Sequence, residues 1–281
     1  MTLKSDIKQA VANNQNSNNL YIRNVVKEIL QNYTLNFIYN SKYKDLIFTG
    51  GTCLRKVYGL NRLSEDLDFD FLDNFVIQQF ASDVKKYFVT SLKISGVTTS
   101  LSGKKNTVLI KFPWETLFDI QEKKISSSVI FLRCDFSKIQ GKNYQTEVNL
   151  ITAGSFSFFV KSYNLPTLFA NKIFAFLERS FYKGKLQKYP FKGRDIYDLF
   201  WLINLSASNQ FKIKPNEKRI GELLKTKSND GLAKLIKEKL KLVDTKFVYE
   251  DLFSLVESPT FLDQFVTNYK DTIEKKIGLL L

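Results

Sequence analysis

Three carboxylates occupy alternate positions in one short stretch of the chain, where Asp66, Asp68 and Asp70 are separated by Leu67 and Phe69. Side chains along a strand alternate between its two faces, so the pattern places the carboxylates on one face and the apolar residues on the other. Like charges on one face repel each other unless cations lie among them. Mg²⁺ prefers such oxygen ligands and commonly binds with a phosphorylated substrate, so the stretch predicts metal-dependent phosphoryl chemistry.

A glycine-rich turn lies just upstream, where Gly50, Gly51 and Thr52 follow a short apolar run and open a stretch with helical spacing. Such a turn lets the backbone approach a phosphate closely, and the helix after it offers free N–H groups. The turn matches neither the P-loop nor the dinucleotide-binding motif, and most Gly-Gly pairs are only turns. We assign these three residues to nucleotide binding, together with Arg55 and Ser64.

A further carboxylate interrupts an apolar run, because residues 129–136 read VIFLRCDF and include Asp135. A charge inside an apolar strand costs free energy unless it is paired or bound to a metal. The alternative is a strand end at which Asp135 simply reaches solvent. The metal reading makes Asp135 the third ligand beside Asp66 and Asp68, with Asp70 in a supporting position.

A second group of charges lies downstream. Lys172 and Arg179 are seven residues apart and share one helix face, and Asp195 and Asp198 are three apart and share another. Apolar residues surround Lys172 in the sequence, so the lysine needs a partner, which would be Asp195 or the phosphates of a nucleotide.

Composition excludes several classes of site. The chain of 281 residues contains no histidine, which rules out a Ser-His-Asp triad, a Cys-His dyad and a histidine base. Its two cysteines, Cys53 and Cys134, cannot complete a thiolate zinc site and form no disulfide framework, which favours a reducing cytoplasm. No apolar run is long enough to cross a bilayer, and the N-terminus lacks the apolar core of a signal peptide.

The charge is strongly positive, at +14. Residues 161–194 contain eight Lys or Arg and one acidic residue, a net charge of +7, and residues 211–246 contain eleven Lys or Arg and five acidic residues, a net charge of +6. The excess therefore lies mostly in the C-terminal half. Such a distribution indicates a polyanionic partner such as a nucleotide or a nucleic acid, the alternative being solubility alone.

Apolar spacing predicts the elements that must position these residues. We expect helices over about the first 45 residues, broken at Asn13–Asn19. The expected strands are Leu46–Thr49, Asp66–Phe71, Ser95–Leu101, Thr107–Phe112, Val129–Phe136 and Ser155–Val160. The other expected helices are Thr52–Tyr58, Phe75–Leu92, Leu165–Phe181, Arg194–Leu205, Glu217–Leu224, Leu232–Leu242 and Phe261–Ile277. The result is an α+β protein with a core over residues 1–160 and a basic helical lobe over residues 161–281.

These motifs together carry a resemblance. Residues 48–52, 66–69 and 134–136 look like the Gly-Gly-Thr, Asp-x-Asp and third-Asp motifs of the polymerase-β-type nucleotidyltransferase superfamily. The longer run GGTCLRKVYGLNRLSEDLDFD resembles the AbiEii/MenT-like nucleotidyltransferase toxins, as do the lysine helix LFANKIFAFLER and the helix GRDIYDLFWL. The matching blocks span roughly half the chain. The resemblance implies a nucleotidyltransferase core with a mixed sheet, flanked by N-terminal helices and a C-terminal helical lobe.

The resemblance also implies an activity. It suggests a toxin of a toxin–antitoxin or phage-abortive system that transfers NMP from an NTP to RNA, with the tRNA 3′ end as acceptor and pyrophosphate as product. Mg²⁺, or Mn²⁺, is the expected cofactor, and a cognate antitoxin the expected partner. The catalytic residues would be Asp66, Asp68, Asp135, Lys172 and Asp195, and the supporting residues Asp70, Arg62, Arg179, Arg194 and Asp198.

Two alternatives remain open at this point. The same metal core could serve a nucleotidyltransferase that modifies a small molecule such as an aminoglycoside. The chain could also be a catalytically silent relative that binds RNA or protein. The charge distribution favours RNA over a small molecule, and the presence of all five catalytic candidates disfavours a silent relative.

Overall fold

The computed structural model describes residues 2–72, 74–103, 106–118, 129–154, 156–179, 181–183, 187–189, 191–208, 213–225 and 231–279. The chain forms two compact units. The first consists of Met1–Ile139 and Thr146–Ser162, and the second of Gln140–Gln145 and Tyr163–Leu281.

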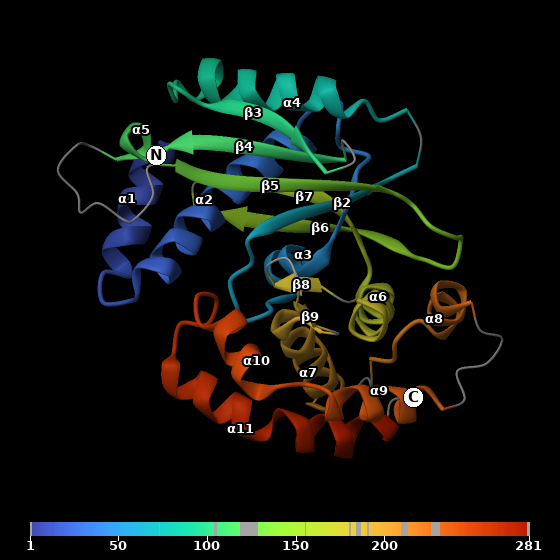
Figure 1. The fold of residues 1–281 in the computed structure, drawn as a ribbon. Coiled ribbons are helices and arrows are strands. Elements are labelled where there is room, and N and C mark those ends of the chain that lie inside the picture. The colour runs from blue at the N-terminus through green and yellow to red at the C-terminus, as the bar shows by residue number, and fades with distance from the viewer. Residues whose placement is uncertain are drawn as a thin grey trace. The chain divides into compact units, whose positions relative to one another are not determined.

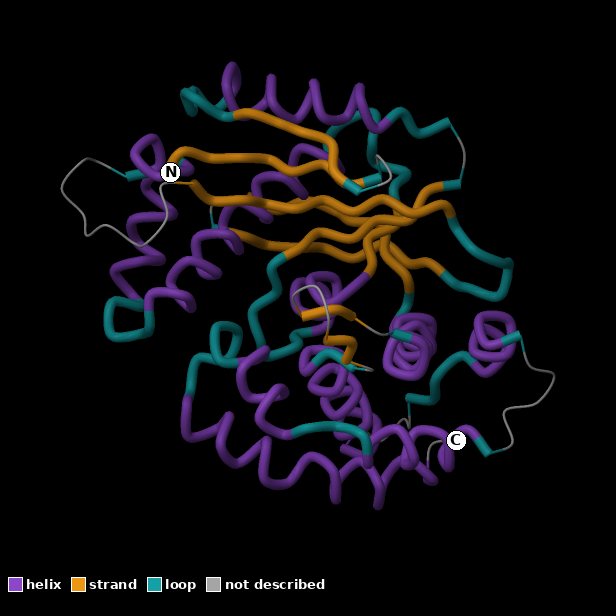
Figure 2. The backbone as a smooth tube through the Cα atoms, viewed as in Figure 1, coloured by secondary structure: helices purple, strands orange, loops and turns teal. Residues whose placement is uncertain are grey.

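The first unit contains a seven-stranded mixed sheet, with the strand order β3-β4-β5-β2-β1-β7-β6 (Figures 1 and 2). The strands are β1 (Ile47–Thr49), β2 (Asp66–Phe71), β3 (Thr98–Ser102), β4 (Thr107–Pro113), β5 (Val129–Lys138), β6 (Thr146–Ala153) and β7 (Phe156–Tyr163). The central pair, β2 and β5, is parallel, as is β1 with β7, whereas β1 with β2 and β4 with β5 are antiparallel.

Helices cover one face of this sheet. They are α1 (Leu3–Asn13), α2 (Asn19–Tyr39), α3 (Gly50–Tyr58), α4 (Ile77–Lys86) and α5 (Trp114–Leu117), with a π-helical turn, η1, at Tyr87–Ser91. In Figure 1, α4 runs along β3 and β4. The rings of Phe37 on α2 and Phe136 on β5 both contact Phe80 on α4, at centroid distances of 6.3 and 4.8 Å. Hence α2 and α4 pack together on the same face of the sheet.

A row of stacked rings crosses the three central strands on that buried face. Phe48 lies opposite Phe69, and Phe69 lies beside Phe136 in the strand register. Both pairs of ring centroids are 5.6 Å apart in stacked orientations, and all three side chains are buried. Because side chains alternate, the neighbours of these rings along each strand point to the other, open face.

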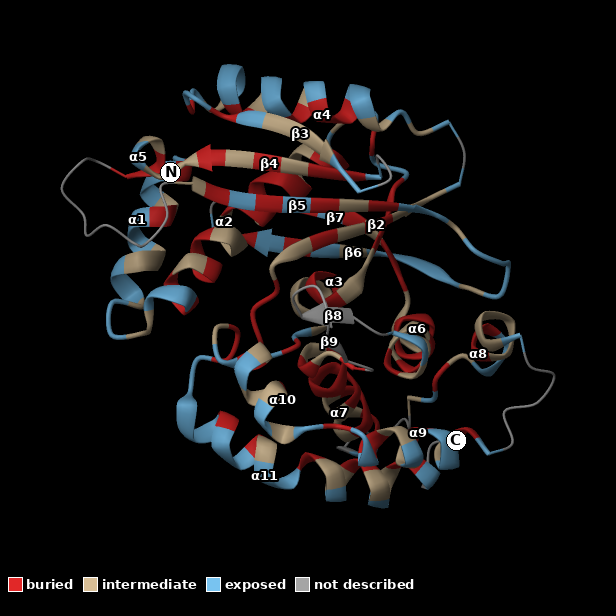
Figure 3. Cartoon of the chain, viewed as in Figure 1, coloured by how far each residue is buried: buried red, intermediate tan, exposed pale blue. Residues whose placement is uncertain are grey.

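The second unit is mainly helical. It contains α6 (Leu165–Glu178), α7 (Gly193–Ser208), α8 (Glu217–Leu224), α9 (Leu232–Lys241), α10 (Thr245–Leu252), α11 (Pro259–Lys276), a 3₁₀ turn, η2 (Ile277–Leu279), and the two-stranded ribbon of β8 (Phe181–Lys183) and β9 (Gln187–Tyr189). Helix α6 packs on α7 and α8, and α7 also packs on α10 and α11. Figure 3 shows the helix faces that are turned inward as buried. No helix in the described part of the chain is both long and apolar enough to cross a membrane.

The observed elements confirm the expected α+β class but correct several boundaries. The expected helix Phe75–Leu92 is wrong in part, because the α-helix spans only Ile77–Lys86 and the π-helical turn η1 follows it. The expected helix Leu165–Phe181 is too long, since it ends at Glu178. Among the described residues, three strands and two helices were missed, namely β6, β8, β9, α5 and α10. In β6 the exposed Val148 and Leu150 blur the period-two pattern.

Replacing Phe69 with alanine tests the importance of the stacked row. We expect the free energy of unfolding to fall by about 3–5 kcal/mol, because the middle ring of the row leaves a cavity among buried neighbours. Urea unfolding followed by circular dichroism measures the change. Phe159→Ala on β7 is the matched control, because that ring is 65% exposed and its loss should change stability by less than about 0.5 kcal/mol. Equal losses in the two variants would contradict the assignment.

Candidate active site

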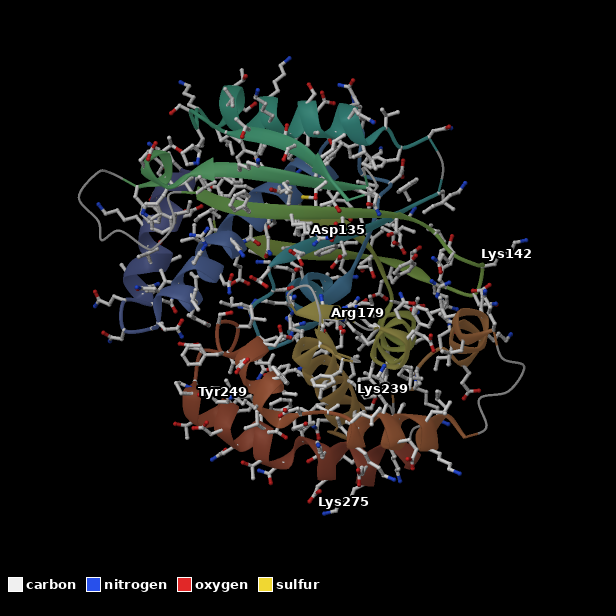
Figure 4. The ribbon with its side chains drawn as sticks, viewed as in Figure 1. Asp135, Lys142, Arg179, Lys239, Tyr249 and Lys275 are labelled. Carbon is white, nitrogen blue, oxygen red and sulfur yellow. The ribbon has the colours of Figure 1, made fainter. Side chains whose placement is uncertain are left out.

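The strand register gathers the predicted carboxylates on the open face of the sheet in the first unit. Asp68 on β2 lies beside Asp135 on β5, and Asp66 lies beside Arg133. Register partners on parallel neighbours point to the same face, so Asp66, Asp68 and Asp135 share it. Asp70, one step further along β2, lies beside Ser137. Figure 4 labels Asp135 on β5.

Arg133 neutralises part of this charge. Its Nε atom lies 2.8 Å from Asp135 Oδ2 and donates to Asp135 Oδ1 at 3.0 Å. Partial burial alone would lower the pKa of Arg133. The hydrogen bond and charge of Asp135, with the charges of Asp66 and Asp68, outweigh burial and raise the pKa above its ordinary value. The sequence contains a signal for this residue: Arg133 is two positions before Asp135 on the same strand, and its side chain must therefore point to the same face.

The donor set fits a divalent ion in its chemistry. Within the described residues, no three carboxylates or thiols are gathered closely enough to hold a metal as they stand. Asp135 instead pairs with Arg133 and accepts a hydrogen bond from the Thr107 hydroxyl. Three carboxylates on adjacent strands, balanced by an arginine, nevertheless form the oxygen-rich environment that hard cations prefer. Asp135 would have to exchange Arg133 for the ion.

The glycine turn approaches these carboxylates very closely. Gly50 has φ of +79°, and a side chain there would overlap the Asp68 carboxylate. At Gly51, a Cβ atom would lie 2.7 Å from Arg62 Nη2 and 3.2 Å from Ser64 Oγ. Both glycines are therefore needed for close approach, Gly50 also for its backbone conformation. The buried Arg62 guanidinium thus lies directly against the turn.

Thr52 and Ser64 are buried beside the turn. The Thr52 hydroxyl donates to the backbone carbonyl of Asp66, which ties α3 to β2. Helix α3 begins at Gly50, and the side chain of its N-cap residue, Thr49, makes no capping hydrogen bond. N–H groups at a helix N-terminus attract anions, so the turn can bind phosphate through its backbone.

A buried ion cluster holds α3 in place. Glu28 on α2 accepts hydrogen bonds from Arg55 Nε and from Arg55 Nη2, the latter at 3.1 Å, and from Lys56 Nζ at 3.1 Å. Burial alone would raise the pKa of Glu28, but Lys56 and Arg55 lower it to about 2. Burial lowers the pKa of Lys56 to about 8 against the attraction of Glu28. Arg55 thus has an acidic partner within the fold, and its assignment to the nucleotide stays a prediction.

The downstream charges form a separate cluster within the second unit. Lys172 Nζ lies 2.6 Å from Asp198 Oδ2 and 3.7 Å from Asp195 Oδ1. Arg179 Nη1 donates to both oxygens of Asp195, at 2.9 and 3.1 Å. Both aspartates are buried, so the two cations are their compensation. Asp198 therefore holds Lys172 more closely than Asp195 does, a division that the spacing alone did not reveal.

Arg194 and the two cysteines have different surroundings. Arg194 pairs with Asp251, Nε to Oδ2, at 3.9 Å, and its backbone N–H donates to the same carboxylate at 3.0 Å. The two cysteines are buried and form no disulfide, and burial raises the pKa of the Cys134 thiol well above its usual range, as expected of an inert core residue. A cavity of about 700 Å³ lies at the far end of β2, lined among others by Tyr43 and Phe75, and includes none of the predicted site residues.

A Glu28→Gln variant tests how strongly the ion cluster holds α3. Removing the carboxylate leaves Arg55 and Lys56 without their acidic partner, so we expect a loss of about 2–4 kcal/mol in the free energy of unfolding at pH 7. The pKa of Glu28 is depressed in the folded state, so its stabilisation is complete above its ordinary value of 4.5 and disappears as the pH falls towards 2. The difference between wild type and variant should shrink accordingly below pH 4.5.

Urea unfolding at several pH values between 3 and 7 measures this difference. Glu257→Gln, at an exposed carboxylate, is the control and should leave stability unchanged. A difference between wild type and Glu28→Gln that stayed constant on acidification would show that the Glu28 charge is not what stabilises α3.

Comparisons with known proteins identify the family of this chain. The family described as nucleotidyl transferase AbiEii toxin, Type IV TA system, matches residues 37–267. No curated protein matches the sequence. Among solved structures, the chain is similar in fold to MenT4, the nucleotidyltransferase toxin Rv2826c from Mycobacterium tuberculosis H37Rv, with 12% identity, a TM-score of 0.56, and coverage of 99% of this chain and 89% of that chain.

A second similar structure is JHP933 from Helicobacter pylori, with 18% identity, a TM-score of 0.49, and coverage of 91% of this chain and 94% of that chain. The family match includes the glycine turn, the strands with the carboxylates, and the helices with Lys172 and Asp195. The resemblance and the fold class expected from the sequence are thereby confirmed. The chain belongs to the AbiEii nucleotidyltransferase toxin family.

Proposed function

We propose that this nucleotidyltransferase transfers NMP from an NTP to an RNA acceptor, with the 3′ end of a tRNA as the favoured target. The observation that carries the proposal is the register of β2 and β5, which gives Asp66, Asp68 and Asp135 one common face beside the glycine turn. The family supports the transferase activity, a toxin role and a cognate antitoxin. A cytoplasmic location accords with an RNA target and with free cysteines.

The residues have distinct roles in this proposal. Asp66, Asp68 and Asp135 would hold Mg²⁺, or Mn²⁺, which when bound neutralises charge on the phosphates. The backbone of Gly50 and Gly51 would bind phosphate at the start of α3. Arg62 would add positive charge beneath that turn, where its guanidinium already lies against Gly51. Thr52 and Ser64 would shape this phosphate site from below, and Asp70 would support the metal ligands.

The transfer itself breaks one bond and forms another. The terminal hydroxyl of the acceptor attacks the α-phosphorus in line, Asp135 accepts the hydroxyl proton, and pyrophosphate leaves. Asp135 is the candidate base because the chain has no histidine. Residues 161–281 would form the RNA-binding lobe. Within them, Lys172 would bind the triphosphate, and Asp195 and Asp198 would orient Lys172 and Arg179.

An Asp66→Ala variant tests the transferase activity. The wild-type protein, incubated with labelled NTPs, Mg²⁺ and total RNA, should transfer label to RNA, and the variant should lose the rate by about 100-fold or more. Asp83→Ala, which removes a carboxylate on α4 that pairs with Lys42, should keep the activity. No transfer by the wild type, or equal transfer by Asp66→Ala, would exclude the proposed reaction.

Salt dependence separates an RNA acceptor from a small molecule such as an aminoglycoside. Contacts with RNA phosphates release counterions, so the KM for RNA should rise by about tenfold or more between 50 and 200 mM salt. A small acceptor would show little change. Initial rates with total tRNA at four salt concentrations measure the slope. A flat profile would favour the small-molecule alternative.

A further inference from the structure

A row of three side chains on β5 continues from the carboxylates along the open face. Asp135, Arg133 and Phe131 occupy alternate positions, so all three point to the face that carries Asp66 and Asp68. Strand β4 adds the partners of this row, because Lys111 lies opposite Phe131 and Thr107 opposite Asp135. The row thus begins at the proposed reacting group and ends at an aromatic ring.

The far end of the row is exposed and positively charged. Phe131 is 43% exposed, whereas its neighbours Ile130 and Leu132 on the other face of the strand are buried. The Lys111 ammonium lies over the Phe131 ring, 5.9 Å from its centroid, and the Arg133 side chain is 51% exposed. One exposed phenylalanine needs no explanation. An exposed ring beside Lys111, in the same row as Arg133 and Asp135, combines the aromatic platform and the positive charge with which proteins bind single-stranded nucleic acid.

We propose that Phe131, Lys111 and Arg133 form a binding track for the single-stranded end of the RNA acceptor, with a base stacked on Phe131 and backbone phosphates beside the two cations. This inference rests on the proposed function, because it assumes that the acceptor end reaches Asp135. Charge complementarity selects the occupant, since a polyanion can approach the three carboxylates only where cations screen them. The exposed ring adds a contact that tolerates any base.

The spacing sets which nucleotide the ring meets. Phe131 lies four positions before Asp135 on the strand, which corresponds to a distance of about 13 Å. A stacked strand advances about 3.4 Å per nucleotide and an unstacked one further. With the terminal hydroxyl at Asp135, the ring therefore meets a base a few nucleotides upstream of the reacting end. Arg133, now paired with Asp135, turns to a phosphate between these two points.

Binding without NTP tests the track separately from catalysis. The probe is a single-stranded RNA of twelve nucleotides with a 5′ fluorophore, and anisotropy gives its Kd. Phe131→Ala should weaken binding about 5- to 100-fold, whereas Phe131→Tyr should restore it. Lys111→Gln should lower the salt slope of log Kd by about one. Phe159→Ala is the matched control, an exposed ring outside the row, and should bind like the wild type.

Abasic substitutions in the probe locate the stacked base. One abasic position, a few nucleotides from the 3′ end, should weaken wild-type binding and have no further effect on Phe131→Ala. Unchanged binding by Phe131→Ala, an equal loss in Phe159→Ala, or absence of binding by the wild type would overturn the track. If the Phe131→Ala loss appears while no RNA accepts label, the track stands and the proposed reaction fails. Label transfer to RNA with an unchanged KM for RNA in Phe131→Ala would overturn the track and leave the proposed reaction standing.

Discussion

The stacked row of Phe48, Phe69 and Phe136 is the interaction on which the rest of the first unit depends. It fixes the register of β1, β2 and β5 from the buried side. A slip by one residue would exchange the two faces of a strand, so that rings would point to solvent and carboxylates into the core. Both consequences are unfavourable. Hydrophobic packing therefore aligns Asp68 with Asp135 in spite of the repulsion between the two carboxylates.

The glycine turn depends on a second set of contacts that are polar. Thr52 ties the start of α3 to the backbone of β2, and Glu28 holds Arg55 and Lys56 further along the helix. Burying these charged groups costs free energy that apolar residues in the same places would not cost. The cluster is therefore better explained as a means of positioning α3 than as a source of stability. It keeps the first turn of α3 against Asp68, where Gly50 leaves room for the carboxylate.

The sequence was sufficient to predict those features of the site that depend on residue spacing within a single strand, turn or helix. The shared face of Asp66 and Asp68, the glycine turn and the helices that carry Lys172 and Asp195 all follow from spacing along one element. Pairing between elements does not follow from spacing, and so the closer partner of Lys172 proved to be Asp198, and Arg133 was overlooked. Strand β6 was missed because its exposed Val148 and Leu150 place apolar side chains on the open face and hide the period.

The open face carries negatively charged carboxylates together with positively charged side chains, and these attract opposite kinds of ligand. Three carboxylates suit a cation, yet they repel every phosphate that a nucleotidyltransferase must bring to them. The net charge of +14 cannot guide a polyanion onto these carboxylates, because salt screens exposed charges that lie more than about 8 Å from them. Local cations must do this, and the open face has Arg133 among the carboxylates and Lys111 at the end of the same row. The proposed metal site and an anionic substrate can therefore share one face.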